Sequence, residues 1–293
     1  MRYFVLLGVL IAIIAVAVLG MRWLGPSGLR YHTATTIQPL QIVLADAEFE
    51  IGTVDIRIEG DMRIVEGNGV PSHAVGAFLR PDFPNEISAQ SYRFEMPANP
   101  QKTEEKFQLS LLTNFGVGLN GVPFDPLAAE YFHGERQNWQ YEALGGAVAL
   151  RLDENNAHVQ PTGGYHYHGL PTLLMLDLGW TENSASPLIG YAADGFPIYA
   201  ITAKIDGVVT KLSSGYVLKE GNRPGGGLPD GDYDGSFTQD YEYRAGLSPL
   251  DECNGMIVRT TEYPIGTYAY FLTEEFPVVP RCLMGAYNES FRK

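Results

Sequence analysis

The sequence predicts a mainly β protein, built as two related β-rich halves that pack into one globular body behind an apolar N-terminal helix. Three observations lead to this prediction. Among 293 residues there are 33 glycines, 19 prolines and 17 tyrosines, which favour turns and aromatic strands over long helices. Several stretches alternate apolar and polar side chains, as strands do. A motif in the middle of the chain also returns about a hundred residues later, which indicates an internal repeat.

The first element in chain order is an apolar run at the N-terminus. Residues 3–21 carry no charge and are flanked by Arg2 and Arg22, and about 20 apolar residues are enough to cross a bilayer as a helix. We therefore expect a signal anchor or signal peptide over residues 1–24 and a polar tether over residues 25–40. An uncleaved anchor is favoured because no A-x-A cleavage site follows. It would hold the body on the periplasmic face of the inner membrane, whereas cleavage would lead to secretion.

The body is expected to cover residues 41–293 and to begin with strands. Residues 49–58 and 91–96 carry apolar side chains at every second position, which is typical of strands with one buried face. A short helical segment is expected over residues 126–132, because Asp125 can cap a helix whose first turn begins with proline.

The repeat lies in the later part of the body, and we expect it to form halves at roughly residues 115–200 and 201–293. Both copies keep two tyrosines, whereas two histidines occur in the first copy alone. Positions that both copies need are expected to pack in the sheet, so the histidines are the candidates for chemistry. The first copy is L-D-E-N-N-A at 152–157 with G-G-Y-H-Y-H at 163–168, and the second is L-D-E-C-N-G at 250–255 with G-T-Y-A-Y-F at 266–271.

The histidines have a spacing that suits a metal ion. In a strand, side chains at i and i+2 point to the same face, so His166 and His168 can both reach one ion while the tyrosines face the other way. His158 precedes a turn at residues 161–164 and can return alongside. Three neutral imidazoles suit zinc or copper and leave one coordination position open. We therefore predict a copper or zinc site at these histidines; the alternative is that they bond to loops or act as a base without metal.

Five other residues are weaker candidates. His133 is interpreted as structural, and His32 and His73 as surface histidines. Asp194 lies in a Gly- and Pro-bounded turn, where it is either a general base or second-shell carboxylate for the metal or simply a turn residue. Asp177 follows the apolar, strand-like run 173–176 and is either a ligand or a strand-end residue.

An acidic loop and two cysteines complete the candidates. Asp230, Asp232 and Asp234 match the opening of a calcium loop, but its twelfth position is a tyrosine, so a solvated acidic turn is the alternative to calcium. Cys253 and Cys282 are the only cysteines and are expected to form a disulfide in an oxidising compartment. The alternative, a thiolate metal pair, lacks the short spacing of zinc sites.

Charge and absent motifs argue against several functions. The net charge of −14 repels a phosphate backbone, so no nucleic acid partner is expected. The sequence has no G-x-S-x-G or P-loop signature, which argues against serine hydrolases, kinases and nucleotide enzymes.

Residues 164–171, G-Y-H-Y-H-G-L-P, resemble the YHYH proteins, a family of mostly bacterial exported proteins named for that tetrapeptide. The resemblance implies export and a shared fold, and it gives weight to the four residues of the tetrapeptide and to His158. The second copy of the repeat departs from the pattern because it lacks both histidines. Over roughly residues 85–290 the likeness includes N-G-V-P-F-D-P at 120–126, A-H-V-Q-P at 157–161, I-G-Y-A-A-D-G-F-P at 189–197, Y-D-G at 233–235, D-Y-E-Y at 240–243, L-D-E-C-N-G at 250–255 and F-P-V-V-P-R-C at 276–282.

Together these observations predict an exported, membrane-tethered metal-binding protein that uses His158, His166 and His168. One alternative is a metal-dependent hydrolase or oxidase in which the same histidines hold the metal and Asp194 acts as base. Another is a β-rich recognition or carbohydrate-binding module without metal. No residue identifies a small-molecule or protein partner.

Overall fold

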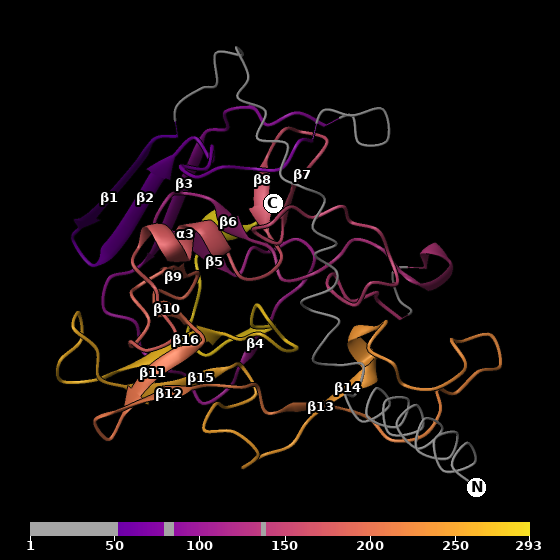
Figure 1. Ribbon diagram of the computed structural model, residues 1–293. Coiled ribbons are helices and arrows are strands. Elements are labelled where there is room, and N and C mark those ends of the chain that lie inside the picture. Colours follow the sequence, from indigo (N-terminus) through magenta and orange to yellow (C-terminus); the bar gives the residue numbers. More distant parts are fainter. Residues whose placement is uncertain (1–51, 79–84, 136–138) are drawn as a thin grey trace, which may run out of the picture.

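The computed structural model describes residues 52–78, 85–135 and 139–293 (Figure 1). They form a mainly β, globular protein with several sheets, as predicted. The expected N-terminal helix, over residues 1–24, and the tether, over residues 25–40, lie outside the described residues. Among the residues described, no helix has the length and apolar character needed to span a membrane.

The largest sheet has eight strands in the order β15-β16-β10-β9-β5-β6-β8-β7. Neighbouring strands are antiparallel except for two parallel pairs, β10 with β16 and β6 with β8. The strands are β5 (Gly116–Gly118), β6 (Pro123–Phe124), β7 (Ala157–Val159), β8 (Tyr165–Tyr167), β9 (Gly190–Ala192), β10 (Pro197–Ala200), β15 (Gly255–Val258) and β16 (Thr267–Leu272).

Smaller sheets surround it. The expected strands near residues 49–58 and 91–96 correspond, where described, to the outer strands of an antiparallel sheet of three. That sheet contains β1 (Val54–Glu59), β2 (Met62–Gly67) and β3 (Tyr92–Pro97). Three two-stranded sheets join β11 (Thr202–Ile205) to β12 (Val208–Lys211), β13 (Tyr216–Leu218) to β14 (Tyr241–Tyr243), and β17 (Cys282–Leu283) to β4 (Phe107–Gln108).

The helix predicted over residues 126–132 was wrong. Asp125 does accept a hydrogen bond from the backbone N–H of Leu127 at 3.3 Å, but its other oxygen is held by Lys293, and no helix follows. The segment ends instead in a 3₁₀ turn, η1 (Phe132–Gly134). Two further 3₁₀ turns are η2 (Thr238–Asp240) and η3 (Glu289–Phe291).

The apolar run at residues 173–176 was also misjudged, since it is helical. It lies in α3 (Thr172–Asp177), which is the α-helix of the described residues. The helix begins directly after Pro171, and the side chain of Asn155 accepts a hydrogen bond from the backbone N–H of Leu173 at 2.9 Å. This bond satisfies one of the amides that a helix leaves free at its N-terminus.

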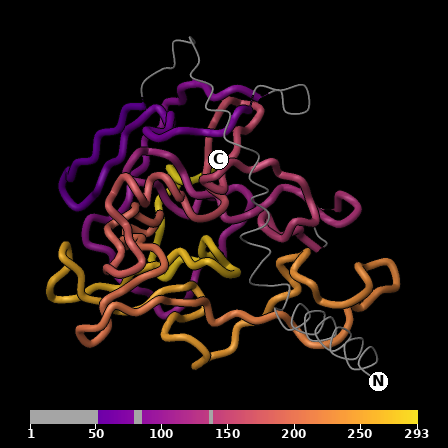
Figure 2. Tube along the Cα trace, viewed as in Figure 1, coloured from indigo at the N-terminus to yellow at the C-terminus, as the bar shows by residue number. Residues whose placement is uncertain are grey.

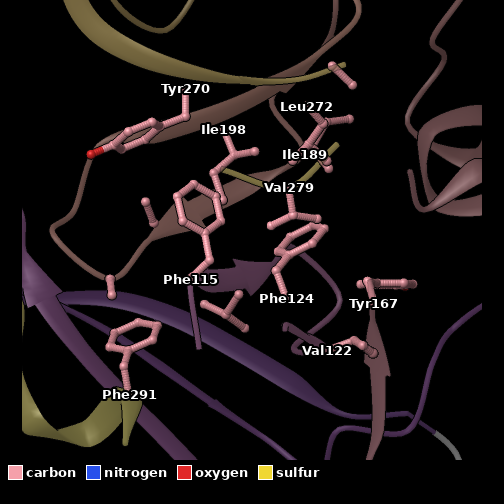
Figure 3. Close-up of a cluster of buried hydrophobic side chains, with 14 of the residues drawn as sticks. Phe115, Val122, Phe124, Tyr167, Ile189, Ile198, Tyr270, Leu272, Val279 and Phe291 are labelled. Atoms are coloured by element: carbon pink, nitrogen blue, oxygen red, sulfur yellow. The ribbon is translucent and has the colours of Figure 1, made fainter. Parts of the chain in front are cut away.

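The main hydrophobic core lies along the eight-stranded sheet. Figure 3 shows Phe115, Phe124, Ile198 and Val279 gathered in this cluster of fully buried side chains. The C-terminal segment returns to the first strands of the described chain, where Phe291 stacks on Phe94 with ring centroids 4.8 Å apart (Figure 2). The core therefore joins the two ends of the described chain.

The predicted disulfide between Cys253 and Cys282 is confirmed. The two Cα atoms are 5.2 Å apart and both cysteines are buried. The bond joins the loop before β15 to β17, so the cysteines are structural here and do not form a thiolate pair.

Candidate metal centre

A two-stranded hairpin positions the three histidines of the motif. His158 in β7 lies directly opposite His166 in β8, and His168 follows the end of β8. The turn between the strands needs a glycine at position 163, where φ is +88° and an added Cβ would lie 1.9 Å from the Ser88 Oγ. His168 is held in line because its backbone N–H donates to the Asn156 carbonyl at 2.8 Å.

The three imidazoles meet at one point. The Nε2 atom of His168 is 3.0 Å from that of His166 and 3.1 Å from that of His158. One nitrogen from each ring can be chosen so that all three lie within 4.8 Å of one another. The alternation of side chains along β8 and the register of the hairpin together produce this convergence.

The outer nitrogens of two rings decide their tautomers. Nδ1 of His158 is 2.8 Å from the Leu150 carbonyl, and Nδ1 of His166 is 3.3 Å from the Gly164 carbonyl. A carbonyl oxygen can only accept, so both Nδ1 atoms carry the proton and both Nε2 atoms present a lone pair. At most one N–H, from His168, can then be shared among three inward-facing nitrogens.

Burial keeps the site neutral. His166 and His168 are only 3% and 4% exposed, and His158 is half-buried. Burial lowers the pKa of His158 below the ordinary histidine value and lowers the pKa of His166 and His168 well below it. Within the described residues, the buried Nδ1 of His168 has no hydrogen-bond partner.

The Asp125 carboxylate, predicted only as a helix cap, lies beside the histidines. Oδ2 of Asp125 is 4.0 Å from Nε2 of His166, and Asp125 is 4% exposed. The same oxygen forms an ion pair with the Lys293 ammonium. Burial raises the pKa of Asp125, and the Lys293 charge offsets part of that rise. Because Lys293 is 168 residues away along the chain, no local sequence pattern predicts this pair.

The tyrosines of the motif anchor the opposite face of β8 in the core. The Tyr165 hydroxyl donates to Asp153 at 2.7 Å. The Tyr167 hydroxyl lies 2.6 Å from Nε2 of His73 and accepts a hydrogen bond from Asn120 at 2.9 Å. His73, expected at the surface, is half-buried and packs behind the motif. These bonds fix the strand that presents the histidines.

The other candidates lie apart from the histidine group. Asp194 is buried in the turn between β9 and β10, where its Oδ2 accepts hydrogen bonds from the Tyr270 hydroxyl at 2.6 Å and the Gly285 backbone at 2.9 Å. Burial raises the pKa of Asp194 to about 7, and these hydrogen bonds oppose the rise. Asp177 is exposed at the end of α3, and His133 is exposed in η1. None of the three belongs to the group of possible metal ligands at the hairpin.

The acidic loop has a cation of its own. Arg223 forms ion pairs with Asp234 and Asp240, and its guanidinium also donates to the Asp230 carbonyl at 3.1 Å. Asp232 accepts a hydrogen bond from the Asn222 side chain at 3.0 Å. The three aspartates of the expected calcium loop therefore do not gather as a group of ligands, unlike the histidines.

Fold and site together define a mainly β protein with a buried cluster of three histidines on one hairpin of its largest sheet. A family model described as YHYH protein matches residues 93–285, and the chain belongs to this family. The tetrapeptide Tyr165–His168 is β8 and the residue after it. No curated protein and no solved structure matches the chain.

Proposed function

We propose that the protein binds one copper or zinc ion through the Nε2 atoms of His158, His166 and His168. The observation that supports this most strongly is that three imidazoles, two buried and one half-buried, direct the same nitrogen to one point, where at most one N–H is available for three inward-facing nitrogens. Metal–nitrogen bonds of about 2.0–2.1 Å at tetrahedral angles place the nitrogens about 3.4 Å apart. Two of the three nitrogen pairs, at 3.0 and 3.1 Å, are already near that spacing, and all three atoms can lie within 4.8 Å of one another.

The donor set limits the choice of ion. Imidazole suits zinc and copper, whereas magnesium and calcium prefer oxygen ligands. The Nδ1 bonds of His158 and His166 to carbonyls are of the kind that orient ligating histidines. Copper would suit an oxidising compartment, and zinc would suit a role without redox change.

We further propose that the histidine hairpin has a structural counterpart later in the chain, as the sequence repeat predicts. Phe124 in β6 lies beside Tyr167 in the parallel strand β8, and Ile198 in β10 lies beside Tyr270 in the parallel strand β16. Each of these parallel pairs is flanked by an antiparallel hairpin on either side. This order supports halves made of β5 to β8 and of β9, β10, β15 and β16, so the boundary proposed from the strand order lies before β9 and not after residue 200 as expected from the sequence.

Side-chain bonds near the two hairpins support the same proposal. Asp153 accepts a hydrogen bond from the Tyr165 hydroxyl at 2.7 Å, and Asp251 accepts one from the Tyr268 hydroxyl at 3.0 Å. The backbone N–H of each aspartate donates to the residue four positions later, at 2.8 and 2.9 Å respectively.

When the two hairpins are compared, the positions of the second hairpin that correspond to the three histidines of the first carry apolar side chains. These apolar residues pack in a hydrophobic cluster with Tyr199 and Leu250. A hairpin of this kind therefore packs well without histidines, which supports a chemical role for them. The counterparts of His158, His166 and His168 are Met256, Ala269 and Phe271.

The location of the protein forms part of the proposal. The apolar run at residues 3–21 and the disulfide support export, with the body tethered outside the cytoplasm. Binding is favoured over hydrolysis because Asp194, the expected base, is bonded to Tyr270 and to the backbone near β17.

Metal analysis tests the proposal. The purified full-length protein, stripped with a chelator and incubated with copper or zinc, should retain about one equivalent after gel filtration, as a single three-histidine site requires. A His166→Ala/His168→Ala variant should lose that equivalent. His133→Ala, which removes an exposed histidine, is the matched control and should retain it. Failure of the wild-type protein to retain metal, or equal retention by the double variant, would contradict the proposal.

A further inference from the structure

We propose, on the basis of the function proposed above, that Asp125 is the fourth ligand of the metal and that Lys293 holds this carboxylate when no metal is bound. The inference concerns how metal loading is regulated. It rests on an ion pair that joins the histidine site to the last residues of the chain.

The backbone places Asp125 next to the motif. The N–H of Asp125 donates to the carbonyl of Tyr167 at 2.8 Å, which continues the parallel pairing of β6 with β8. Its Oδ2 lies 4.0 Å from Nε2 of His166, just outside the group formed by the three histidines. Two ligand atoms on one tetrahedral zinc ion lie about 3.4 Å apart, so the carboxylate must move closer to the histidine nitrogens to complete the shell.

Lys293 is held beside this carboxylate by the backbone. Its N–H donates to the Leu112 carbonyl at 2.9 Å, and the neighbouring Arg292 forms a β-bridge with Thr113. Figure 1 places the C-terminus beside β8, in agreement with the ion pair to Asp125. The ammonium is also close enough to contribute to the lowered pKa of nearby histidines.

Electrostatic repulsion should prevent the metal ion and the Lys293 ammonium from sharing the Asp125 carboxylate. A divalent ion at the histidines and the Lys293 ammonium would repel each other across a buried site of low dielectric constant. The carboxylate of Asp125 can neutralise one of them fully. Since the Lys293 side chain is 21% exposed, its ammonium can turn into solvent when the metal takes the carboxylate.

A fourth protein ligand also determines whether the metal keeps an open coordination position for a reacting water. Three imidazoles and one carboxylate complete a tetrahedral shell and leave no position for a reactive water. This arrangement suits storage, delivery or structural use of the ion more than hydrolysis. In the proposed second half, the position that corresponds to Asp125 is Tyr199, whose hydroxyl bonds to Glu262 at 2.9 Å in an otherwise apolar cluster.

Competition titrations with zinc and a chelator of known affinity test the inference on the full chain. Asp125→Asn should weaken zinc binding by roughly tenfold or more, the scale on which groups around a metal affect affinity. Lys293→Gln should act in the opposite direction and tighten binding, also by roughly tenfold. In the Asp125→Asn background, Lys293→Gln should lose its effect, because the two residues act through one contact. Lys211→Gln, which removes an exposed lysine paired with Glu274, is the matched control.

The outcomes separate this inference from the proposed function. Zinc bound by the wild-type protein through the histidines, with unchanged affinity in Asp125→Asn or unchanged or weaker affinity in Lys293→Gln, overturns the inference alone. No zinc binding by the wild-type protein overturns both. A misfolded variant cannot imitate tighter binding, so the Lys293→Gln result decides even if Asp125→Asn is unstable. As a second readout, chemical labelling of the Lys293 amine should increase when zinc is added.

Discussion

Two residues that each lie in a turn between antiparallel strands make different hydrogen bonds to a buried tyrosine hydroxyl. Asn120, between β5 and β6, donates to the Tyr167 hydroxyl at 2.9 Å, whereas Asp194, between β9 and β10, accepts from the Tyr270 hydroxyl at 2.6 Å. The Asn120 amide forms its hydrogen bond as a neutral group. The buried carboxyl group of Asp194 must either lose its hydration as an anion or carry a proton. Burial accordingly raises the pKa of Asp194 to about 7.

This shift predicts how stability changes with pH. The unfolded carboxyl has a pKa of about 3.9, so between pH 4 and 7 the folded protein keeps a proton that the unfolded chain has lost. The stabilisation is fully present below about pH 4 and is lost as pH rises through 7. The free energy of unfolding of the wild-type protein, relative to Asp194→Asn, should therefore fall by about 4 kcal/mol between pH 4 and pH 8.

Urea unfolding of both proteins across this pH range measures the difference, and taking the difference cancels the opposite contribution of the buried histidines. Asp177→Asn, at an exposed carboxylate, is the matched control. A stability difference between wild type and Asp194→Asn that stays constant, or grows with pH, would show that Asp194 is ionised throughout.

Among single residues, the sequence predicted the site correctly where residue spacing alone determines the face of a strand to which a side chain points. A strand turns residues i and i+2 to one face, so His166 and His168 could be placed together, and a short turn returned His158 to them. Asp125 and His73 were missed because their partners, Lys293 and Tyr167, come from distant parts of the chain. Contacts of that kind depend on the tertiary fold and leave no local pattern.

At the scale of elements, apolar alternation predicted the strands but was ambiguous in short runs. Residues 173–176 are apolar at every position, and the capping bond that the Leu173 backbone donates to Asn155 favours a helix there. Near Pro126 the expected helix does not form, although Asp125 accepts a hydrogen bond from the Leu127 backbone.

The disulfide connects two elements outside the histidine hairpin, so its removal should affect stability and leave the site intact. A Cys253→Ser/Cys282→Ser variant should lose about 3 kcal/mol of unfolding free energy, because the cross-link of 29 residues no longer restricts the unfolded chain. Metal stoichiometry should remain that of the wild-type protein. Loss of metal from an otherwise folded variant would indicate a role for the thiols that the structure does not provide.

At the scale of the whole molecule, the sequence predicted a mainly β body but could not predict the order of its strands. The eight-stranded sheet alternates strands from distant parts of the chain, and β16 pairs in parallel with β10 across about 70 residues. Repeated sequence motifs indicate that two units are similar, but they do not say how the units join. In the proposed division into halves, the two units would meet through β5 and β9, which are antiparallel.

The central claim is that the hairpin of the YHYH motif holds a single metal ion, and anomalous diffraction from zinc-loaded crystals tests it most directly. We predict one strong anomalous peak at roughly 2.0–2.2 Å from the Nε2 atoms of His158, His166 and His168. A peak only elsewhere, such as at the acidic loop 230–234, would contradict the account, and so would Nε2 atoms of His166 and His158 that stay 3.0 and 3.1 Å from that of His168 with no peak between them.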